Sequence, residues 1–285
     1  MPDKIRRINS KDVSDAVCQL FLNANTIAGE DLREKVDQAI ETERDPLAKG
    51  VLCAMKENAE IASKNDLPIC QDTGMAIVFA EVGSLIHIEG DTLENAVNAG
   101  VSRAYLEGKL RCSVVNDPLY KRINTGDNTP AVLHIRSVPG DQLKLTAAPK
   151  GFGSENMSAI RMFTPSAKEK DVIDYVVSVV SKAGSNPCPP ITVGVGIGSD
   201  FEGCALLAKR ALTLPLSDQN PDPFYAALEK KMLDRINELK IGAQGFGGDT
   251  TAFAVKIEVA PTHIAGLPVA VNINCHVVRH TSVLL

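Results

Sequence analysis

The chain has 285 residues, of which 44% are hydrophobic and 4% aromatic, and it carries a formal net charge of -5. This length allows one large domain or two smaller ones, and the apolar content is sufficient for a packed core. An acidic balance without blocks of like charge argues against nucleic acid or an anionic membrane as the main partner. The scarcity of aromatic residues also leaves few surfaces on which bases could stack.

The apolar residues are distributed in short segments. None reaches the roughly 18 consecutive residues that a membrane-spanning helix needs, and the N-terminal sequence MPDKIRRINSKDV lacks the apolar segment of a secretion signal. We therefore expect a cytoplasmic protein. The cysteines lie at positions 18, 53, 70, 112, 188, 204 and 275. Because a reducing compartment disfavours disulfides, a cysteine with a function here is expected to be a metal ligand or a nucleophile.

Apolar periodicity predicts that the first quarter of the chain is helical. The first helix is expected to follow Ser10, with Gly29 closing it, the second to cover residues 30–43, and the third to run from Pro46 to about residue 63.

Cys18 and Cys53 lie on the apolar faces of the first and third of these helices. We expect both to be buried as small hydrophobic residues.

From residue 75 the pattern becomes that of strands. Strands are predicted over 75–83 and 84–90, followed by a helix that Asp91 caps. The segments AVLHIRSV (131–138) and LKLTAAP (143–149) are expected to pair as a hairpin across PGDQ.

The second half of the chain continues with mixed elements. A helix is predicted after GSENMS, and the further elements are a helix over 168–183, a strand in ITVGVGIG, helices near 201–212 and 222–239, and strands in AFAVKIEV and PVAVNIN. This order predicts an α+β fold with mixed and antiparallel sheets packed against helices. We expect residues 1–285 to form one domain, with a division into two lobes near residue 150, at PKGFGSEN.

Three cysteines lie in polar or proline-rich segments rather than on apolar helix faces. Cys70 precedes QDTG, Cys188 lies within NPCPP, and Cys275 is followed by His276. Their wide separation matches no zinc finger or ribbon, whose ligands occur in close pairs. The residues alone leave three interpretations open: a three-thiolate metal site, a nucleophilic cysteine assisted by a histidine, and core packing.

Two glycine-rich turns invite a functional interpretation. GVGIGSD (194–200) follows a predicted strand, but its spacing differs from the dinucleotide-binding pattern G-x-G-x-x-G. QGFGGDTT (244–251) is suited to a nest of backbone N–H groups that binds an anion such as a carboxylate, and equally to an ordinary tight turn. No G-x-x-x-x-G-K-[ST] sequence is present, which argues against a nucleoside triphosphate.

Longer motifs carry a resemblance to a known family. From about residue 45 to the C-terminus the chain resembles the alpha subunit of class I, iron-sulfur-dependent fumarate hydratase and its relative, the alpha subunit of L(+)-tartrate dehydratase. The motifs are PICQDTG, NTGDNTPAVLHI, PKGFGSENMSAIRMFTP, CPPITVGVGIG with ALLAKRAL, IGAQGFGGDTTAFAVKIE and THIAGLPVAVNINCHVVRH.

The resemblance implies a [4Fe-4S] cluster on three cysteines, which fall here on Cys70, Cys188 and Cys275. Such a cluster has one iron without a protein ligand, and this iron can act as a Lewis acid toward a substrate carboxylate and hydroxyl. Cys112 and Cys204 match no ligand position, so we expect them to be structural.

The resemblance also assigns the substrate contacts. It places Gln71 and Asp72 beside the substrate, with Asp72 as the acid that handles the hydroxyl. Arg111 matches an arginine that binds a substrate carboxylate with two hydrogen bonds, although Arg122 is a nearby competitor for that role. Gly153 matches a backbone contact near the substrate.

The implied reaction is the addition of water to fumarate to give L-malate and its reverse, a step of the tricarboxylic acid cycle. The alternative within the class is dehydration of L(+)-tartrate, and a non-enzymatic alternative is a metal-binding interaction protein. In single-chain members a second domain follows and supplies the base and further cations. The resemblance therefore implies a separate beta subunit that completes the site, in an alpha2/beta2 assembly.

Overall fold

A computed structural model describes residues 5–285, which divide into two compact units. Unit 1 contains residues up to Ala28 together with Ile61–Gly151 and Arg279–Leu285, and unit 2 contains Gly29–Glu60 and Phe152–Val278. Both units combine helices with mixed sheets, so the predicted α+β class is confirmed. None of the helices formed by residues 5–285 combines the length and the apolar composition needed to cross a lipid bilayer.

Unit 1 is built on a four-stranded sheet in the order β10-β5-β2-β4. Its strands are β2 (Met75–Gly83), β4 (Val132–Val138), β5 (Leu143–Lys150) and β10 (Thr281–Leu284). A second, two-stranded parallel sheet pairs β1 (Arg6–Asn9) with β3 (Ile86–Glu89).

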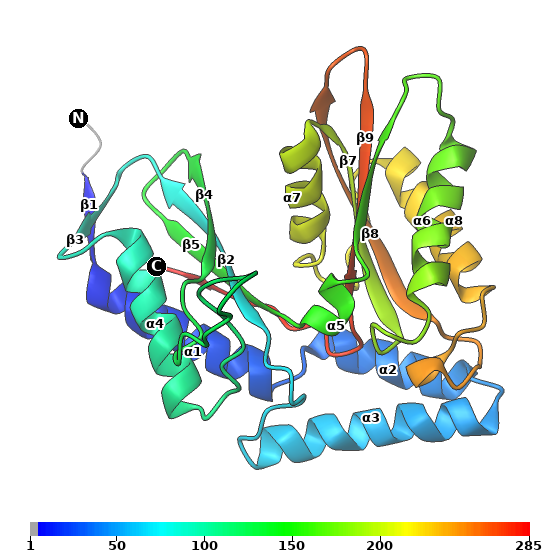
Figure 1. Ribbon diagram of the computed structural model, residues 1–285, viewed down its shortest axis with the longest axis horizontal. Helices are drawn as coiled ribbons and strands as arrows, with labels where there is room; N and C mark the ends of the chain where they lie inside the picture. The colour runs from blue at the N-terminus through cyan, green and yellow to red at the C-terminus, as the bar shows by residue number, and fades with distance from the viewer. Residues whose placement is uncertain (1–4) are drawn as a thin grey trace. The chain divides into compact units, whose positions relative to one another are not determined.

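Two helices cover the four-stranded sheet of unit 1, α1 (Ser10–Thr26) and α4 (Leu93–Glu107) (Figure 1). Asn9 caps α1 by accepting a hydrogen bond from the backbone of Lys11, and Thr92, rather than the expected Asp91, caps α4. The apolar faces of both helices pack with alternate residues of β2 and β5 in one hydrophobic core. Their buried members include Val13, Val17, Phe21, Val97, Val101, Tyr105, Val78 and Leu145.

The predicted hairpin between the segments that form β4 and β5 is wrong. β2 lies between them, parallel to β4 and antiparallel to β5. β2 is the most apolar strand of this sheet, and a central position buries more of its surface than an edge position would. The chain between β4 and β5 therefore crosses the end of β2 instead of forming a tight turn.

Unit 2 is built on a four-stranded sheet in the order β6-β9-β7-β8. The strands are β6 (Ala159–Phe163), β7 (Ile191–Ser199), β8 (Ala252–Thr262) and β9 (Leu267–Asn274). β7 runs parallel to β8 and antiparallel to β9. β6 occupies the segment after GSENMS, so the helix predicted there is wrong; the short helix α5 (Phe152–Glu155) precedes it instead.

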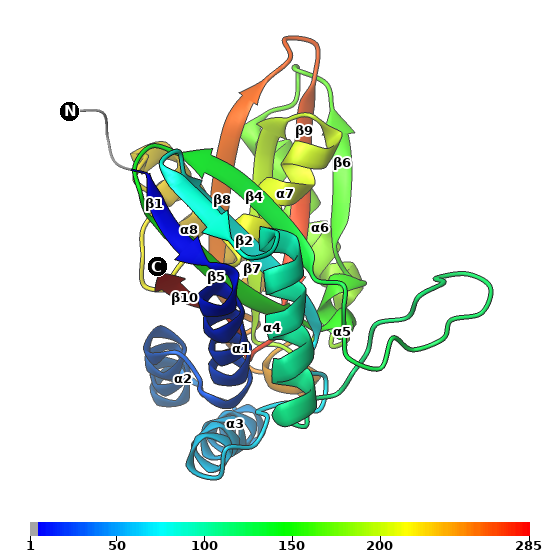
Figure 2. The same ribbon diagram turned by 90° about the vertical axis from the view of Figure 1, so that its left-hand side faces the viewer.

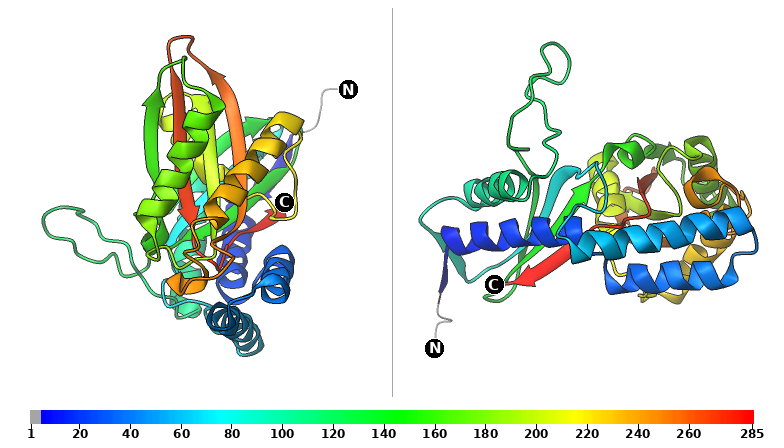
Figure 3. Two further views of the ribbon diagram at one scale, coloured as in Figure 1. Left: turned by 90° about the vertical axis from the view of Figure 1, so that its right-hand side faces the viewer. Right: turned by 90° about the horizontal axis from the view of Figure 1, so that it is seen from below.

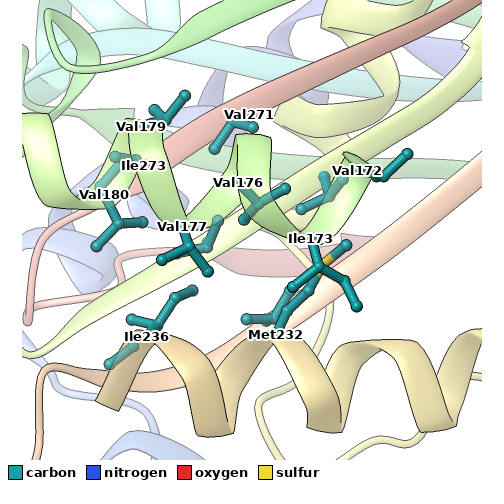
Figure 4. Packing of buried hydrophobic residues seen from close by; sticks show 14 of the residues in the cluster. Val172, Ile173, Val176, Val177, Val179, Val180, Met232, Ile236, Val271 and Ile273 are labelled. Atoms are coloured by element: carbon teal, nitrogen blue, oxygen red, sulfur yellow. The ribbon is translucent and has the colours of Figure 1, made fainter. Parts of the chain in front are cut away.

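Helices cover both faces of this sheet, as the left panel of Figure 3 shows. One face packs against α6 (Glu169–Ala183) and α8 (Pro223–Asn237), whose valine, isoleucine and methionine side chains interdigitate with those of β9 (Figure 4). The other face packs against α7 (Phe201–Ala211). Two further helices belong mainly to unit 2, α2 (Glu30–Thr42) and α3 (Pro46–Lys64), so the helical first quarter is confirmed.

The glycines of GVGIGSD serve packing. A Cβ at Gly194 would lie 2.2 Å from the backbone oxygen of Ala208, and one at Gly196 would lie 2.2 Å from that of Cys204. Both oxygens belong to α7. Because Gly194 and Gly196 have no side chains, α7 can pack closely against the sheet at these positions. This packing accounts for the glycine spacing without a bound dinucleotide.

Of the two cysteines expected in the core, one is buried and the other is exposed. Cys18 is buried in the core of unit 1, but Cys53 on α3 is exposed. The expectation for Cys53 was wrong because α3 turns this position to a surface formed with charged residues of α2 and α3, among them Asp37 and Lys56.

Candidate functional site

The QDTG segment of unit 1 lies in a loop, residues 69–74, between the end of α3 and β2. The buried hydroxyl of Tyr105 lies 2.8 Å from the carbonyl oxygen of Thr73 and 2.9 Å from that of Gly74, so it can donate to either. Asn128, which is fully buried, donates from Nδ2 to the same Gly74 oxygen over 3.1 Å. Burial raises the pKa of the Tyr105 hydroxyl, which therefore keeps its proton as a donor at neutral pH.

The side chains of Asp72 and the buried Arg279 both lie next to Gly151, the residue that follows β5. The Oδ1 atom of Asp72 accepts a hydrogen bond of 3.1 Å from the backbone of Gly74. A Cβ at Gly151 would lie 2.9 Å from Asp72 Oδ2 and 3.4 Å from Arg279 Nη2. Arg279 is only 5% exposed and donates from Nη1 to Asn25 Oδ1 over 2.9 Å. Unit 1 thus brings an acid and a fixed cation to one glycine that leaves room for both.

Arg279 is a residue that the sequence reading missed. It lies four residues after Cys275 in the motif NINCHVVRH, so the available signal was the only arginine among the residues that follow Cys275. Its burial could not be inferred because Arg279 returns to unit 1 while Cys275 belongs to unit 2.

The other predicted residues of unit 1 lie on or beside the same loop. Cys70 is half-buried, and its Sγ lies 3.5 Å from Oε1 of the exposed Gln71. The side chain of Arg111 is exposed, and its carbonyl oxygen accepts a hydrogen bond of 3.0 Å from Thr73 Oγ1. Unit 1 therefore groups Cys70, Gln71, Asp72 and Arg111.

Cys188 and Cys275 lie on adjacent loops of unit 2. Cys188 is exposed, occupies a turn after α6, and has a φ of 55°, which is uncommon for a residue other than glycine. The backbone N–H of His276 donates to the carbonyl oxygen of Cys188 over 3.2 Å, which ties the turn after α6 to the end of β9. Backbone outliers of this kind are retained where surrounding structure over-determines them, often at functional sites.

Gln244 joins these two cysteine-bearing loops. Its backbone N–H and its Nε2 both donate to the carbonyl oxygen of Pro189, over 2.7 and 3.0 Å. Its Nε2 also lies 3.2 Å from Nδ1 of His276, and that Nδ1 lies 3.2 Å from the Cys188 oxygen. The imidazole of His276 is thus engaged with loop groups, which favours a positioning role over that of a base for a neighbouring thiol.

Gly153, in α5, belongs to the same part of unit 2. A Cβ there would lie 3.5 Å from the carbonyl oxygen of Asn186, two residues before Cys188. Unit 2 therefore groups Gly153, Cys188 and Cys275, whereas the remaining predicted site residues belong to unit 1.

The glycine-rich turn QGFGGDTT holds a carboxylate that belongs to the chain. Glu43, which is 5% exposed, lies between α2 and α3. Its Oε2 accepts from the backbone N–H groups of Asp249 and Thr250 over 2.8 and 3.3 Å, and its Oε1 accepts from those of Arg44 and Asp45 over 3.0 Å each. The predicted anion nest is real, and an internal anion fills it.

The turn is further held by charge at its surface. Asp249 binds the guanidinium of Arg44 through two hydrogen bonds of 2.7 and 2.8 Å and also contacts Lys240. These cations hold the pKa of the Asp249 carboxyl below its usual range. The turn carrying Gln244 is thus attached to the α2–α3 connection from both sides.

Cys112, which is half-buried, and Cys204 were expected to be structural. Cys204 is fully buried and donates its thiol to the carbonyl oxygen of Gly196 over 3.3 Å, and burial raises its pKa to about 11. Burial also raises the pKa of the Cys112 thiol. Because the thiolate is the reactive and metal-binding form, the buried Cys204 is poorly suited to either role.

The thiols predicted as ligands are all free of disulfides. Within residues 5–285, no group of three or more His, Cys, Asp or Glu side chains has the arrangement of a metal site. The predicted thiols are divided between the units, one in unit 1 and two in unit 2.

Comparison with known proteins identifies the chain's relatives. The family model described as "Fumarate hydratase (Fumerase)" matches residues 14–284. A protein of Methanocaldococcus jannaschii named "Putative L(+)-tartrate dehydratase subunit alpha" is 39% identical over 268 residues, which cover 92% of this chain and 94% of that protein. The "L(+)-tartrate dehydratase subunit alpha" of Escherichia coli O157:H7 is 29% identical over 277 residues, which cover 96% of this chain and 90% of that protein.

These matches define the chain as a hydro-lyase. It belongs to the fumarate hydratase family, and the relatives named above are alpha subunits of their enzymes.

Replacing Glu43 with glutamine tests the internal carboxylate. In Glu43→Gln one carboxylate oxygen becomes an NH2 group that faces backbone N–H donors, so at least one donor loses its acceptor. We expect the free energy of unfolding to fall by about 1–3 kcal/mol, measured by chemical denaturation. Glu41→Gln, at an exposed position of α2, is the matched control and should leave stability unchanged. Equal stability of the two variants would contradict this account of the turn.

Proposed function

We propose that the chain is the cluster-bearing alpha subunit of an iron-sulfur hydro-lyase that interconverts fumarate and L-malate. The proposal rests on the family match and, in the structure, on the placement of Asp72 and Arg279 against Gly151. A carboxyl group that can exchange a proton beside a fixed cation suits a substrate that carries a hydroxyl and carboxylates.

The thiols of Cys70, Cys188 and Cys275 fit an iron-sulfur group by their chemistry. Thiolates are the soft ligands that such clusters require, and these three thiols are neither fully buried nor oxidised to disulfides. A [4Fe-4S] cluster on three thiolates would supply a Lewis-acidic iron for a substrate oxygen. We propose that residues 1–285 act as one catalytic domain.

Each remaining residue has a proposed task toward the substrate. In the direction of dehydration, Asp72 donates a proton to the departing hydroxyl, and in the direction of hydration it takes that proton back. Gln71 donates a hydrogen bond to the substrate, and Arg111 binds a carboxylate with its guanidinium. Gly153 contributes a backbone contact, for which its exposed position in α5 leaves access.

The elimination also needs a base that removes the proton bound to carbon. We propose that a separate beta subunit supplies this base and further cations, in an alpha2/beta2 assembly in the cytoplasm. The names of the relatives support a partner chain because each is an alpha subunit.

A second candidate reaction is the dehydration of L(+)-tartrate, the activity in the names of those relatives. Tartrate differs from malate by one hydroxyl, and part of the pocket that would distinguish them belongs to the proposed beta subunit.

A substrate panel tests the reaction and the division of the site. We expect the chain with its beta subunit, reconstituted without oxygen, to hydrate fumarate faster than it dehydrates L(+)-tartrate, measured by absorbance of fumarate and by detection of oxaloacetate. The chain alone should be inactive because it lacks the base. Preference for tartrate would select the second candidate, and full activity of the isolated chain would refute the divided site.

Serine substitutions test the ligands. We expect replacement of Cys70, Cys188 or Cys275 with serine to abolish the absorbance of the cluster and the activity, because an alkoxide is a poor ligand for iron. Cys53→Ser is the matched control since Cys53 is an exposed free thiol, and it should keep both properties. Iron and sulfide content of anaerobically purified protein is the measurement, and stoichiometric zinc without iron would contradict the assignment.

An isosteric substitution tests Asp72. If Asp72 donates a proton in the transition state, Asp72→Asn should lower kcat by about 100-fold or more. The cluster absorbance should be unchanged because the neighbouring thiol is untouched. Loss of the cluster together with activity would make Asp72 a structural residue instead.

A further inference from the structure

Residues 114–125 of unit 1 form an arm in the connection between α4 and β4. Its two sides are joined by backbone hydrogen bonds from Thr125 to Val114 over 2.9 Å and from Asn116 to Ile123 over 2.8 Å. Val115 and Asn124 form an antiparallel bridge between them. Figure 2 and the right panel of Figure 3 show this connection extending away from the helices and strands of unit 1.

The tip of the arm is held in one conformation by Asp117. Its carboxylate accepts from the backbone N–H groups of Leu119, Tyr120 and Lys121 over 3.0, 2.9 and 3.1 Å. These bonds lower the pKa of the Asp117 carboxyl, so the clamp stays charged at neutral pH. The tip is therefore ordered by its own contacts rather than by packing against the sheet.

The same tip exposes large apolar side chains. Leu119 is 90% exposed, Tyr120 82% and Ile123 60%. An ordered loop that presents apolar and aromatic side chains to water has the character of a binding anchor. Because the conformation already exists, binding would cost little ordering entropy.

The charged residues at the tip of the arm indicate which kind of partner surface would be complementary to it. Lys121 and Arg122 are exposed beside the apolar side chains, and the guanidinium of Arg122 also donates to the carbonyl oxygen of Pro118. The carboxylate of Asp117 accepts from backbone N–H groups. A complementary surface would therefore be an apolar socket with a rim of carboxylates.

The residues that flank the arm are connected to the QDTG loop through Asn128. Asn124 Nδ2 donates to the carbonyl oxygen of Cys112 over 2.9 Å, next to Arg111. Ser113 donates its backbone N–H to Asn128 Oδ1 over 2.7 Å, and Asn128 in turn holds Gly74. Hydrogen bonds thus connect the base of the arm, through Cys112, Ser113 and Asn128, to the loop that carries Asp72.

We propose that the arm docks into an apolar, acid-rimmed socket on the partner subunit and thereby fixes the QDTG loop and Arg111 beside the residues that the partner contributes. This inference rests on the proposed function, because that function requires a second chain near Asp72. A second copy of this chain is the less suitable occupant, since it would not bring the missing base to the loop at which the arm is anchored.

The experiment measures binding of the full-length chain to the beta subunit of the same organism by surface plasmon resonance. In the arm variant, Leu119, Tyr120 and Ile123 are replaced with glutamine. The matched control variant replaces Ile5, Leu106 and Ile135 with glutamine, which are also more than half exposed and lie in unit 1. We expect the arm variant to raise Kd by at least about 100-fold and the control to change it by less than about threefold.

Far-ultraviolet circular dichroism and the melting temperature of each variant check the fold. The substituted arm residues are exposed, so both properties should equal those of the wild type. Replacing Lys121 and Arg122 with glutamine should slow association and reduce its dependence on salt.

The outcomes separate this inference from the proposed function. If the folded arm variant binds the beta subunit as tightly as the wild type does, the inference is overturned whatever the activity is. If it loses only self-association, measured by analytical ultracentrifugation, a second copy occupies the arm and the inference is also overturned. Binding that depends on the arm, in a complex that transforms neither diacid, would support the docking role and reject the proposed reaction.

Discussion

The hydrogen bonds from Tyr105 and Asn128 to the backbone of residues 73–74 fix the loop on which the candidate chemistry of unit 1 depends. Tyr105 belongs to α4, whose apolar face is packed into the core, so the position of the loop is set by the packing of a helix on a sheet. A buried carbonyl oxygen needs a partner, and these side chains provide it without using the loop's own polar groups. Within the loop, Asp72 Oδ1 additionally accepts a hydrogen bond from the backbone of Gly74.

In unit 2, other polar side chains hold the loops that carry the candidate residues. The turn that carries Gln244 is held by the buried carboxylate of Glu43, and Gln244 then holds Pro189 and approaches His276. Both cysteine-bearing loops are thus connected through a chain of backbone contacts to the α2–α3 connection. In each unit a buried polar side chain orders the backbone, while the thiols and carboxylate of the proposed site stay at the surface of the loops.

Arg279 gives this arrangement an electrostatic component. Its guanidinium is almost fully buried, is held by Asn25 of α1 and lies against the same glycine as Asp72. A buried cation is costly unless its hydrogen bonds are satisfied, and Asn25 accepts one of those that Arg279 donates.

The sequence by itself determined the fold class, the bounds of β2, the helical first quarter and the family, because hydrophobic periodicity and long motifs are local signals. It also singled out Cys70, Cys188 and Cys275 by their polar context. Tertiary structure alone decided that β2 separates β4 from β5, that Glu43 fills the glycine-rich turn and that Arg279 accompanies Asp72. These contacts join residues far apart in the chain, and their geometry depends on strand order and helix packing, which no local pattern encodes.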